Sequence, residues 1–276
     1  VPPQTAPQSQ PALVFTLLRG LARPIFLFSS ARSTLHPAKM APWSIEGCTV
    51  DDAAALGRNN GAAFWDQPMW KMMWPEDKTR EYLMEQLTKR LPMRLLRNRD
   101  IMRHQKAVDA ETGALIGYAR WELPEGSKVA PGTGDPEWLD AQVPDVGADQ
   151  WRAFEELEAS SWWEPREDMG ELDSKNEAIQ DRILAERPYI KLDYLAVHPE
   201  NTGRGIATAL VESGMREAEK MGIPIYIFAF KSARGIYVKL GFKEVDRLVQ
   251  DDSAFGGSGD YGVYFMVYEV APGAAR

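Results

Sequence analysis

The sequence predicts an α/β domain in which helices pack on a central sheet. Residues 189–197 have strand character and lead through a glycine-containing turn into a helical pattern that reaches about Met221. Residues 225–230 read as a buried strand, and a short helical pattern follows over residues 233–240. Earlier in the chain the order is strand, helix, helix, strand, strand. This alternation predicts one domain over residues 43–270, preceded by a leader and interrupted by an insert.

This domain is expected to begin with one strand that is followed by two helices. A strand is expected over residues 43–48, and a helix begins near residues 51–52, where either aspartate can cap it. The sequence Asp-Gln-Pro at residues 66–68 ends that helix. A second helix is expected over residues 75–91, because a proline opens it and leucines recur on one face.

Two strands and a long insert follow. Residues 101–108 and 114–123 are expected to form strands joined by a turn that contains a glycine. The insert, residues 124–188, consists of glycine- and proline-containing loops and two acid-rich helical pieces near residues 149–163 and 173–186. It is expected to form a lid or side wall near the substrate, or else a decoration on the edge of the sheet.

The chain ends in two strands with a flexible connection between them. One strand runs to about Val249, and the last one covers residues 263–270. The connection, residues 250–262, is rich in Gly, Ser and Asp, a composition typical of a mobile loop.

Composition excludes several classes of protein. The 276 residues leave room for one domain with additions or for two small ones, and 44% hydrophobic residues with nine Trp are ample for a core. No run approaches the roughly 18 apolar residues of a membrane span. Cys48 is the only cysteine, so an intrachain disulfide and a cysteine zinc cluster are excluded, and a reducing compartment is suitable. Because His36, His104 and His198 are far apart, no metal site is expected.

The leader, residues 1–39, differs in charge from the rest. It contains four basic residues and no acidic ones, which is typical of an organellar transit peptide; the alternative is an unstructured extension, or translation that begins at Met40. Subtracting those four leaves 28 basic against 40 acidic residues, a net charge of −12 for the remainder. This balance argues against a nucleic-acid partner and an anionic membrane. A cytoplasmic location is expected, or a mitochondrial one if the leader is a transit peptide.

The glycine-containing turn has the character of a phosphate site. In Thr202-Gly203-Arg204-Gly205-Ile206-Ala207, the glycines lie between a strand and the start of a helix. Such a turn aims unpaired backbone N–H groups at one point, and the helix dipole adds partial positive charge there. Neither a dinucleotide fingerprint nor a G-x-x-x-x-G-K-[ST] loop is present. Plain turn chemistry remains the alternative for this segment alone.

A second motif lies downstream, at residues 233–242, and reads Ala-Arg-Gly-Ile-Tyr-Val-Lys-Leu-Gly-Phe. Together the two motifs resemble the signatures of the GNAT superfamily of N-acetyltransferases, and the insert is similar to those of fungal members. The family's coenzyme A loop reads Gln or Arg, two residues, Gly, one residue, then Gly or Ala. Here Thr202 departs from that pattern, whereas Gly205 and Ala207 match it. Phe230 stands where relatives have Asn, a position whose hydrogen bond Lys231 or Ser232 could supply.

The resemblance implies a fold and a cosubstrate. The implied fold is a mixed, mostly antiparallel sheet flanked by helices and splayed between its fourth and fifth strands. Acetyl-CoA would place its pantetheine arm in that gap, bonded to backbone groups of Leu195 and Val197, and no metal would take part. The implied coenzyme-binding residues are Leu195, Ala196, Val197, Thr202, Gly203, Arg204, Gly205, Ile206, Ala207, Thr208, Phe230, Ser232 and Tyr237.

The implied chemistry is direct attack of an amine on the thioester in a ternary complex. Tyr237, which matches the family's tyrosine, is the candidate general acid; its alternative role is to anchor the short helix in the core. Asp193 is the candidate base, because relatives often hold a carboxylate on this strand. It could equally be a structural partner of Lys191, with deprotonation through water instead. Along this strand, alternation predicts that Lys191, Asp193, Leu195 and Val197 share one face until a bulge resets the phase.

The expected acceptor is the primary amine of a small molecule. In relatives, the segment between the first two helices and the connection between the last two strands border the acceptor. Residues 69–74, dense in Met and Trp, could therefore line the site, or pack in the core. Asp251, Asp252 and Asp260 could attract an ammonium group, or serve as solvated charges. A coenzyme-binding sensor and a protein lysine or N-terminal acetyltransferase remain alternatives, and either a monomer or a homodimer is expected.

Overall fold

A computed structural model describes residues 42–126 and 137–270. The predictions for the leader, and for the part of the insert at residues 127–136, lie outside the described residues. No helix in the described ranges is long and apolar enough to cross a membrane.

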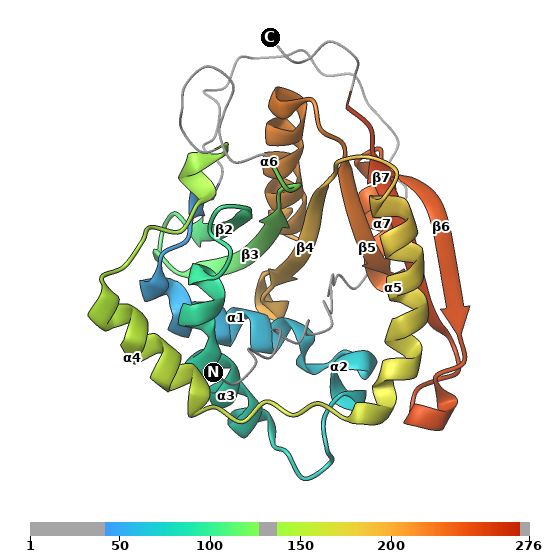
Figure 1. Ribbon diagram of the computed structural model, residues 1–276, viewed down its shortest axis with the longest axis horizontal. Coiled ribbons are helices and arrows are strands. Elements are labelled where there is room, and N and C mark those ends of the chain that lie inside the picture. The colour runs from blue at the N-terminus through green and yellow to red at the C-terminus, as the bar shows by residue number, and fades with distance from the viewer. Residues whose placement is uncertain (1–41, 127–136, 271–276) are drawn as a thin grey trace, which may run out of the picture.

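Seven strands form one sheet in the order β1-β2-β3-β4-β5-β7-β6 (Figure 1). All neighbours pair antiparallel except β4 and β5, which pair parallel. The predicted mixed, mostly antiparallel sheet is thus confirmed. The strands are β1 (Trp43–Gly47), β2 (Met102–Asp109), β3 (Leu115–Glu122), β4 (Ile190–Val197), β5 (Ile225–Phe230), β6 (Lys243–Gln250) and β7 (Tyr261–Tyr268).

The parallel pair β4–β5 separates soon after it begins. Its pairing covers only Ile190 with Ile225, Lys191 with Tyr226, and Leu192 with Ile227. Beyond these positions β4 continues to Val197 with β3 as its partner, while β5 continues with β7. The sheet is therefore splayed between its fourth and fifth strands, as expected.

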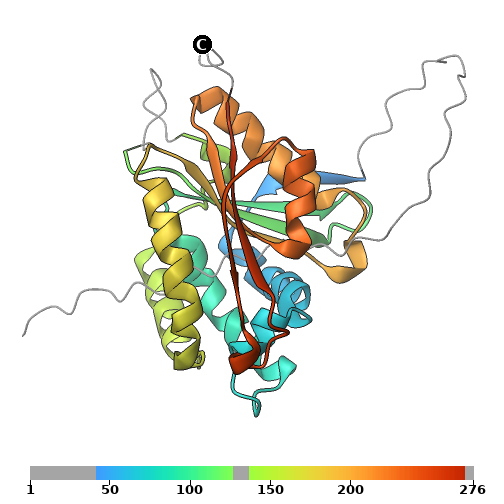
Figure 2. The same cartoon turned by 90° about the vertical axis from the view of Figure 1, so that its right-hand side faces the viewer.

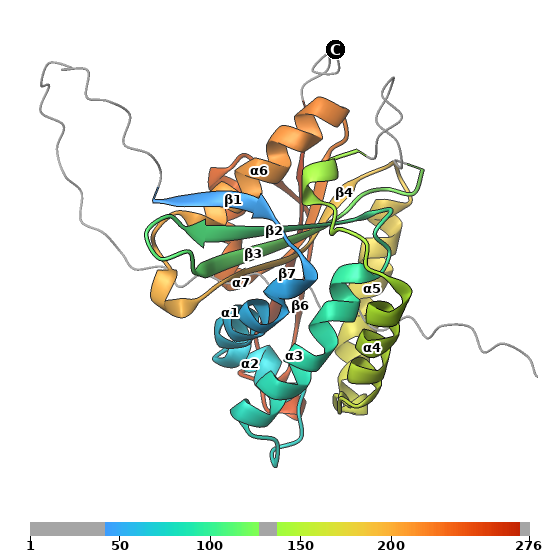
Figure 3. The same ribbon diagram turned by 90° about the vertical axis from the view of Figure 1, so that its left-hand side faces the viewer.

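Helices cover both faces of the sheet. Figure 3 shows α6 on one face and α1 to α5 on the other, and Figure 2 shows α5 (yellow) and α7 (orange) on opposite sides of the last strands. The helices are α1 (Ala53–Trp65), α2 (Pro68–Met72), α3 (Arg80–Leu96), α4 (Ala148–Ala159), α5 (Gly170–Leu184), α6 (Ile206–Met221) and α7 (Lys231–Lys239).

The side chains of β5 alternate between these two layers. Ile225, Ile227 and Ala229 pack in the cluster that contains α6 and α7. Tyr226 and Phe228 pack in the cluster that contains α2 and α5. Every one of these side chains is buried, so β5 reads as a continuous apolar run rather than as an alternating one.

Several predicted boundaries differ from the structure. The second long helix runs over residues 80–96 rather than 75–91, because the hydroxyl of Thr79 caps it by accepting from the Tyr82 N–H, and buried side chains carry it past Pro92. The short helix begins at residue 231 instead of 233, and the last strand covers residues 261–268 instead of 263–270.

The predicted faces of β4 are also corrected. In the register with β3, Trp121 pairs with Leu192 and Arg120 with Tyr194, so Asp193 is an extra, bulged residue. The bulge resets the alternation, and Leu192 rather than Asp193 shares a cluster with Leu195 and Val197.

The described part of the insert packs on the helical layer opposite α6. Helix α4 lies along α3 (Figure 3), and α5 lies beside β6. Between them, Arg166 bridges two separate segments: its backbone N–H donates to the Met73 carbonyl, and its guanidinium donates to the carbonyls of Met72 and Phe255. The insert therefore ties α2 to the β6–β7 connection.

Candidate active site

The turn between β4 and α6 has the backbone that a phosphate site requires. Gly203 and Gly205 have φ angles of 76° and 89°, which favour glycine, and Gly205 is the N-cap of α6. The N–H groups in the first turn of a helix have no intrahelical acceptor. Those of Ile206, Ala207 and Thr208 stand in this turn, so they are available to an anion at the positive end of the helix dipole.

Side chains of this turn are engaged within the protein. The Thr202 hydroxyl donates to the Pro199 carbonyl at 2.8 Å, which holds the turn that precedes the glycines. Arg204 donates to Asn201 at 2.6 Å and to the Asp109 carboxylate at 2.9 Å. What the turn offers an anion is therefore its backbone first, with the exposed Arg204 close by.

Asn59 of α1 holds the end of β4, and sequence reasoning missed it. Its amide donates to the Ala196 carbonyl at 3.2 Å and accepts from the His198 N–H at 3.0 Å. Because Asn59 is buried at 2% exposure, these bonds fix the strand just before the glycine turn. No motif marks a lone asparagine in a helix, and only the fold shows its partners.

Tyr237 lies in the layer of α6 and α7. It is completely buried, and its ring contacts that of Phe242 edge to face, with centroids 5.5 Å apart. The Phe242 N–H donates to the Tyr237 carbonyl at 2.9 Å, so the Gly-Phe end of the motif fixes the last turn of α7. Tyr237 shares a cluster with Leu195 and Val197, the strand residues predicted to border the coenzyme.

Asp193 lies in a buried ion pair. Its carboxylate accepts from the guanidinium of Arg120, at 2.5 Å from Nε, and Lys191 Nζ lies 3.7 Å from its other oxygen. Burial alone raises the pKa of Asp193, but Arg120 and Lys191 outweigh it and hold the pKa below its usual range. This arrangement favours the structural alternative for Asp193, because a carboxylate with two cations is a weak proton acceptor.

His104 also lies on this side of the sheet, and its electrostatic surroundings keep it neutral. Burial, with Arg120 nearby, lowers the pKa of His104 to about 3. Its Nδ1 lies 2.8 Å from the Tyr118 hydroxyl. Within the described ranges, no group of three or more His, Cys, Asp or Glu residues could hold a metal ion.

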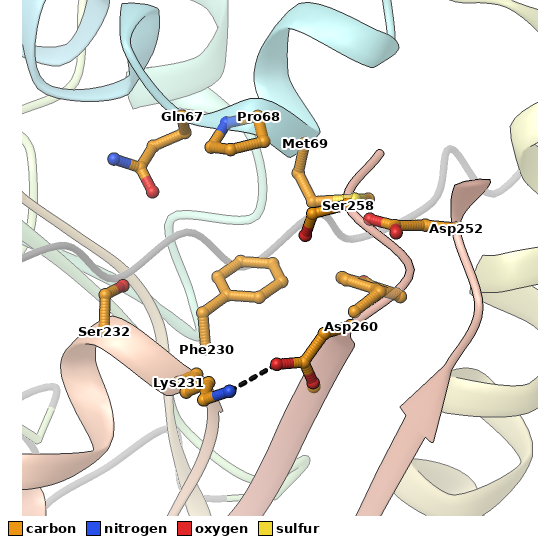
Figure 4. A pocket seen from close by; sticks show the side chains of 11 residues that line it. Gln67, Pro68, Met69, Phe230, Lys231, Ser232, Asp252, Ser258 and Asp260 are labelled. Carbon is orange, nitrogen blue, oxygen red and sulfur yellow. Dashed lines mark hydrogen bonds and ion pairs between the residues drawn. The ribbon is translucent and has the colours of Figure 1, made fainter. Parts of the chain in front are cut away.

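A cavity of about 360 Å³ lies where α2, the start of α7 and the β6–β7 connection meet (Figure 4). Its walls come from three separate segments of the chain. In Figure 4, Phe230 lies between Ser232 on one side and Asp252 on the other. The lining residues are Gln67, Pro68, Met69, Phe230, Lys231, Ser232, Asp252, Ser258, Asp260, Tyr261 and Gly262.

The predicted site residues thus fall into three groups. The glycine turn, the strand residues up to Val197 and Tyr237 belong to β4, α6 and α7. Phe230 and Ser232 line the cavity, as do Asp252 and Asp260, whereas Asp251 is exposed and accepts from the Ser253 N–H. Asp193 lies in the ion pair with Arg120 and is not part of the hydrophobic cluster that contains Tyr237. Most of residues 69–74 are buried in the cluster of α2 and α5, and Met69 also lines the cavity.

Comparison with solved structures gives matches at low identity. A histone acetyltransferase HPA2 and related acetyltransferase from Corynebacterium glutamicum is 16% identical, with 83% of this chain and 97% of that chain covered and a TM-score of 0.49. A polyamine N-acetyltransferase from Drosophila melanogaster, which forms N-acetylagmatine, is 13% identical, with 83% and 100% covered and a TM-score of 0.47. The ribosomal-protein-S18-alanine N-acetyltransferase from Escherichia coli is 13% identical, with 85% and 99% covered and a TM-score of 0.42.

Comparison with family models and curated sequences completes these findings. No curated sequence matches the chain significantly. The family model that matches is described as an acetyltransferase (GNAT) domain, and it covers residues 172–244, from α5 into β6. This segment holds both the glycine turn and Tyr237.

Proposed function

We propose that this protein is an N-acetyltransferase that moves an acetyl group from acetyl-CoA to the primary amine of a small molecule. One observation carries the proposal: β4 and β5 separate beyond Leu192, and the freed end of β4 leads directly into a turn with two positive-φ glycines. A strand edge without a partner strand can bond an extended pantetheine arm, and the turn can bind a diphosphate.

The residues of β4 and α6 would share the binding of the coenzyme. The first-turn N–H groups of α6 would hold the diphosphate, and the backbone of Leu195 and Val197 would bond the arm. Asn59 would keep this strand end in place, since it already holds the residues on either side of Val197. In the usual GNAT pattern a long polar side chain adds one contact here, and the Thr202 hydroxyl, bonded to Pro199, does not replace it.

The reaction would need two proton transfers. The amine nitrogen forms a bond to the thioester carbon, the carbon–sulfur bond breaks, and the sulfur leaves as a thiolate that takes up a proton. We assign that proton to the Tyr237 hydroxyl. The proton that the ammonium loses would pass to water, since Asp193 is held by Arg120 and Lys191.

The cavity at α2 would receive the acceptor. Its size suits a small molecule, and it is bordered by the β6–β7 connection and the start of α7. Arg166 joins two of its walls through the carbonyls of Met72 and Phe255, so the insert would give the cavity a fixed shape.

Calorimetric titration of the full chain with acetyl-CoA tests the proposal, with adenosine diphosphate as the comparison. We expect micromolar binding of acetyl-CoA and weaker binding of the diphosphate, followed by thiol release when amines are added. A folded sample that does not bind acetyl-CoA would refute the coenzyme site. Binding without thiol release for any amine would favour the alternative of a coenzyme sensor, which the departures at Thr202 and Phe230 motivate.

A further inference from the structure

Asp252 is a buried carboxylate at the end of β6, on the wall of the acceptor cavity. Its residue is only 4% exposed, and its Oδ1 accepts from the Gly259 N–H at 2.6 Å. A Cβ added at Gly257 would lie 2.1 Å from this carboxyl group, so the loop is folded closely around it. Among the described residues, Asp252 has no ion pair. It is therefore a largely buried carboxyl group without a cationic partner among the described residues.

The other charges of the cavity neutralise each other. Asp260 pairs with Lys231, as the dashed line in Figure 4 shows. The remaining described lining residues carry no charge, since they are Gln, Pro, Met, Phe, Ser, Tyr and Gly. The net charge contributed by the described cavity walls is therefore that of Asp252.

A buried carboxylate of this kind calls for a cation. Removing a charge from water is costly unless an opposite charge or several hydrogen bonds compensate, and among the described residues the Asp252 carboxyl group accepts one hydrogen bond, from the Gly259 N–H. In Figure 4 its carboxylate points toward Met69 and Ser258, on the cavity side. Phe230 and Met69 contribute apolar surface to the same cavity wall as Asp252.

Asp252 follows the end of β6, and strands β7 and β5 lie between β6 and the coenzyme gap. The strand order is β4-β5-β7-β6, so two strand spacings separate β6 from β5, which borders the gap. With neighbouring strands about 4.8 Å apart, β6 and β5 lie about 10 Å from each other. Gln67 and Ser232 lie on one side of Phe230 in Figure 4, and Asp252 lies on the other.

We propose that the acceptor carries a second cationic group, remote from the amine that is acetylated, and that Asp252 binds it. The acceptor would thus be a long diamine, or an amine of similar length with another ammonium or guanidinium group, whose apolar stem passes Phe230. This inference rests on the proposed function, because it names the substrate class of the same site.

A purely structural role for Asp252 can be separated from this one. Asp252→Asn keeps an oxygen that can accept from the Gly259 N–H but removes the charge. Asp251→Asn is the matched control, because Asp251 is the exposed neighbour in the same loop and its oxygen accepts from Ser253. Thermal melting of both variants checks that the loop and the fold are retained.

The test compares 1,8-diaminooctane with octylamine as acceptors for the full chain. In the wild type we expect the KM for the diamine to be lower than that for the monoamine by about tenfold or more. Asp252→Asn should remove this difference by raising the KM for the diamine, whereas Asp251→Asn should preserve it. Binding of the diamine in the absence of acetyl-CoA, measured by calorimetry, should weaken in parallel in Asp252→Asn.

Contrary outcomes distinguish the two proposals. Equal KM values for the two amines in an active wild type would overturn the role of Asp252 and leave the acetyltransferase in place; this comparison needs no variant. An equal loss with both amines in Asp252→Asn would assign the residue to the loop structure alone. If acetyl-CoA does not bind and neither amine releases thiol, the proposed function itself fails.

Discussion

The coenzyme side and the acceptor side of this molecule are built from different groups. On the coenzyme side, the geometry is that of the backbone: two glycines with positive φ, a helix N-terminus and a strand edge that leaves its neighbour. On the acceptor side, side chains from residues 67–69, 230–232 and 252–262 meet around one cavity. A backbone site leaves a readable glycine pattern, whereas a site made of distant side chains becomes visible only once the chain is folded.

The largest expected effect is on the coenzyme side, in Gly205→Tyr. At φ of 89° a side chain is strained, and a bulky ring would occupy the space that a ligand needs in front of the helix. We expect calorimetric binding of acetyl-CoA to be lost.

Gly113→Ala provides a control for backbone strain. Gly113 also has a positive φ, 68°, in the β2–β3 turn, and its added Cβ would meet nothing within 4 Å. It should cost about 1 kcal/mol of stability and leave coenzyme binding unchanged. Retained micromolar affinity in Gly205→Tyr would show that the turn is not the coenzyme site.

A smaller effect is expected from Tyr237→Phe, which tests a side chain on the coenzyme side. Phenylalanine keeps the ring contact with Phe242 but removes the hydroxyl. If the hydroxyl protonates the thiolate, kcat for thiol release should fall on the order of 100-fold while the affinity for acetyl-CoA stays within about threefold.

Tyr268→Phe is the matched control, because the Tyr268 hydroxyl donates to Glu219 away from the gap. Its turnover should equal that of the wild type. An unchanged kcat in Tyr237→Phe would assign Tyr237 to core packing, the alternative that its complete burial also suits.

The difference between the two sides explains what the sequence could predict. Strand β5 and helix α6 are found within a residue or two of the expected positions, because an apolar run and a glycine at each helix end mark them. The continuation of α3 past Pro92 was not predictable, because buried Met93, Leu95 and Leu96 outweigh the bond that proline removes. Local rules cannot weigh such tertiary packing.

The candidate site, too, was predictable only in part. The glycine turn and Tyr237 follow from two motifs. The hydrogen-bond partners of Asn59 lie more than a hundred positions away in the sequence. The burial of Asp252 depends on how the loop around it folds. The bulge at Asp193, which turns this residue away from Leu195 and Val197, has no signature in the strand's own sequence.

Asp193→Asn tests whether this carboxylate takes part in the reaction or only stabilises the fold. It leaves Arg120 buried with an uncompensated charge, so the free energy of unfolding should fall by about 3–5 kcal/mol. Asp246→Asn, which removes a solvent-exposed ion pair with Arg182, should cost no more than about 1 kcal/mol. Urea unfolding of the two variants measures the difference.

The pH dependence of stability gives Asp193 a second test. Because its folded pKa lies below the usual value, the ion pair contributes fully above the unfolded pKa of about 3.9 and is lost as the pH falls through the lower folded value. The wild type should therefore lose more stability than Asp193→Asn as the pH falls below about 4. At neutral pH the folded variant should keep kcat within about tenfold of the wild type, since water takes the amine proton. A fall of about 100-fold or more in kcat, with stability retained, would instead make Asp193 the base.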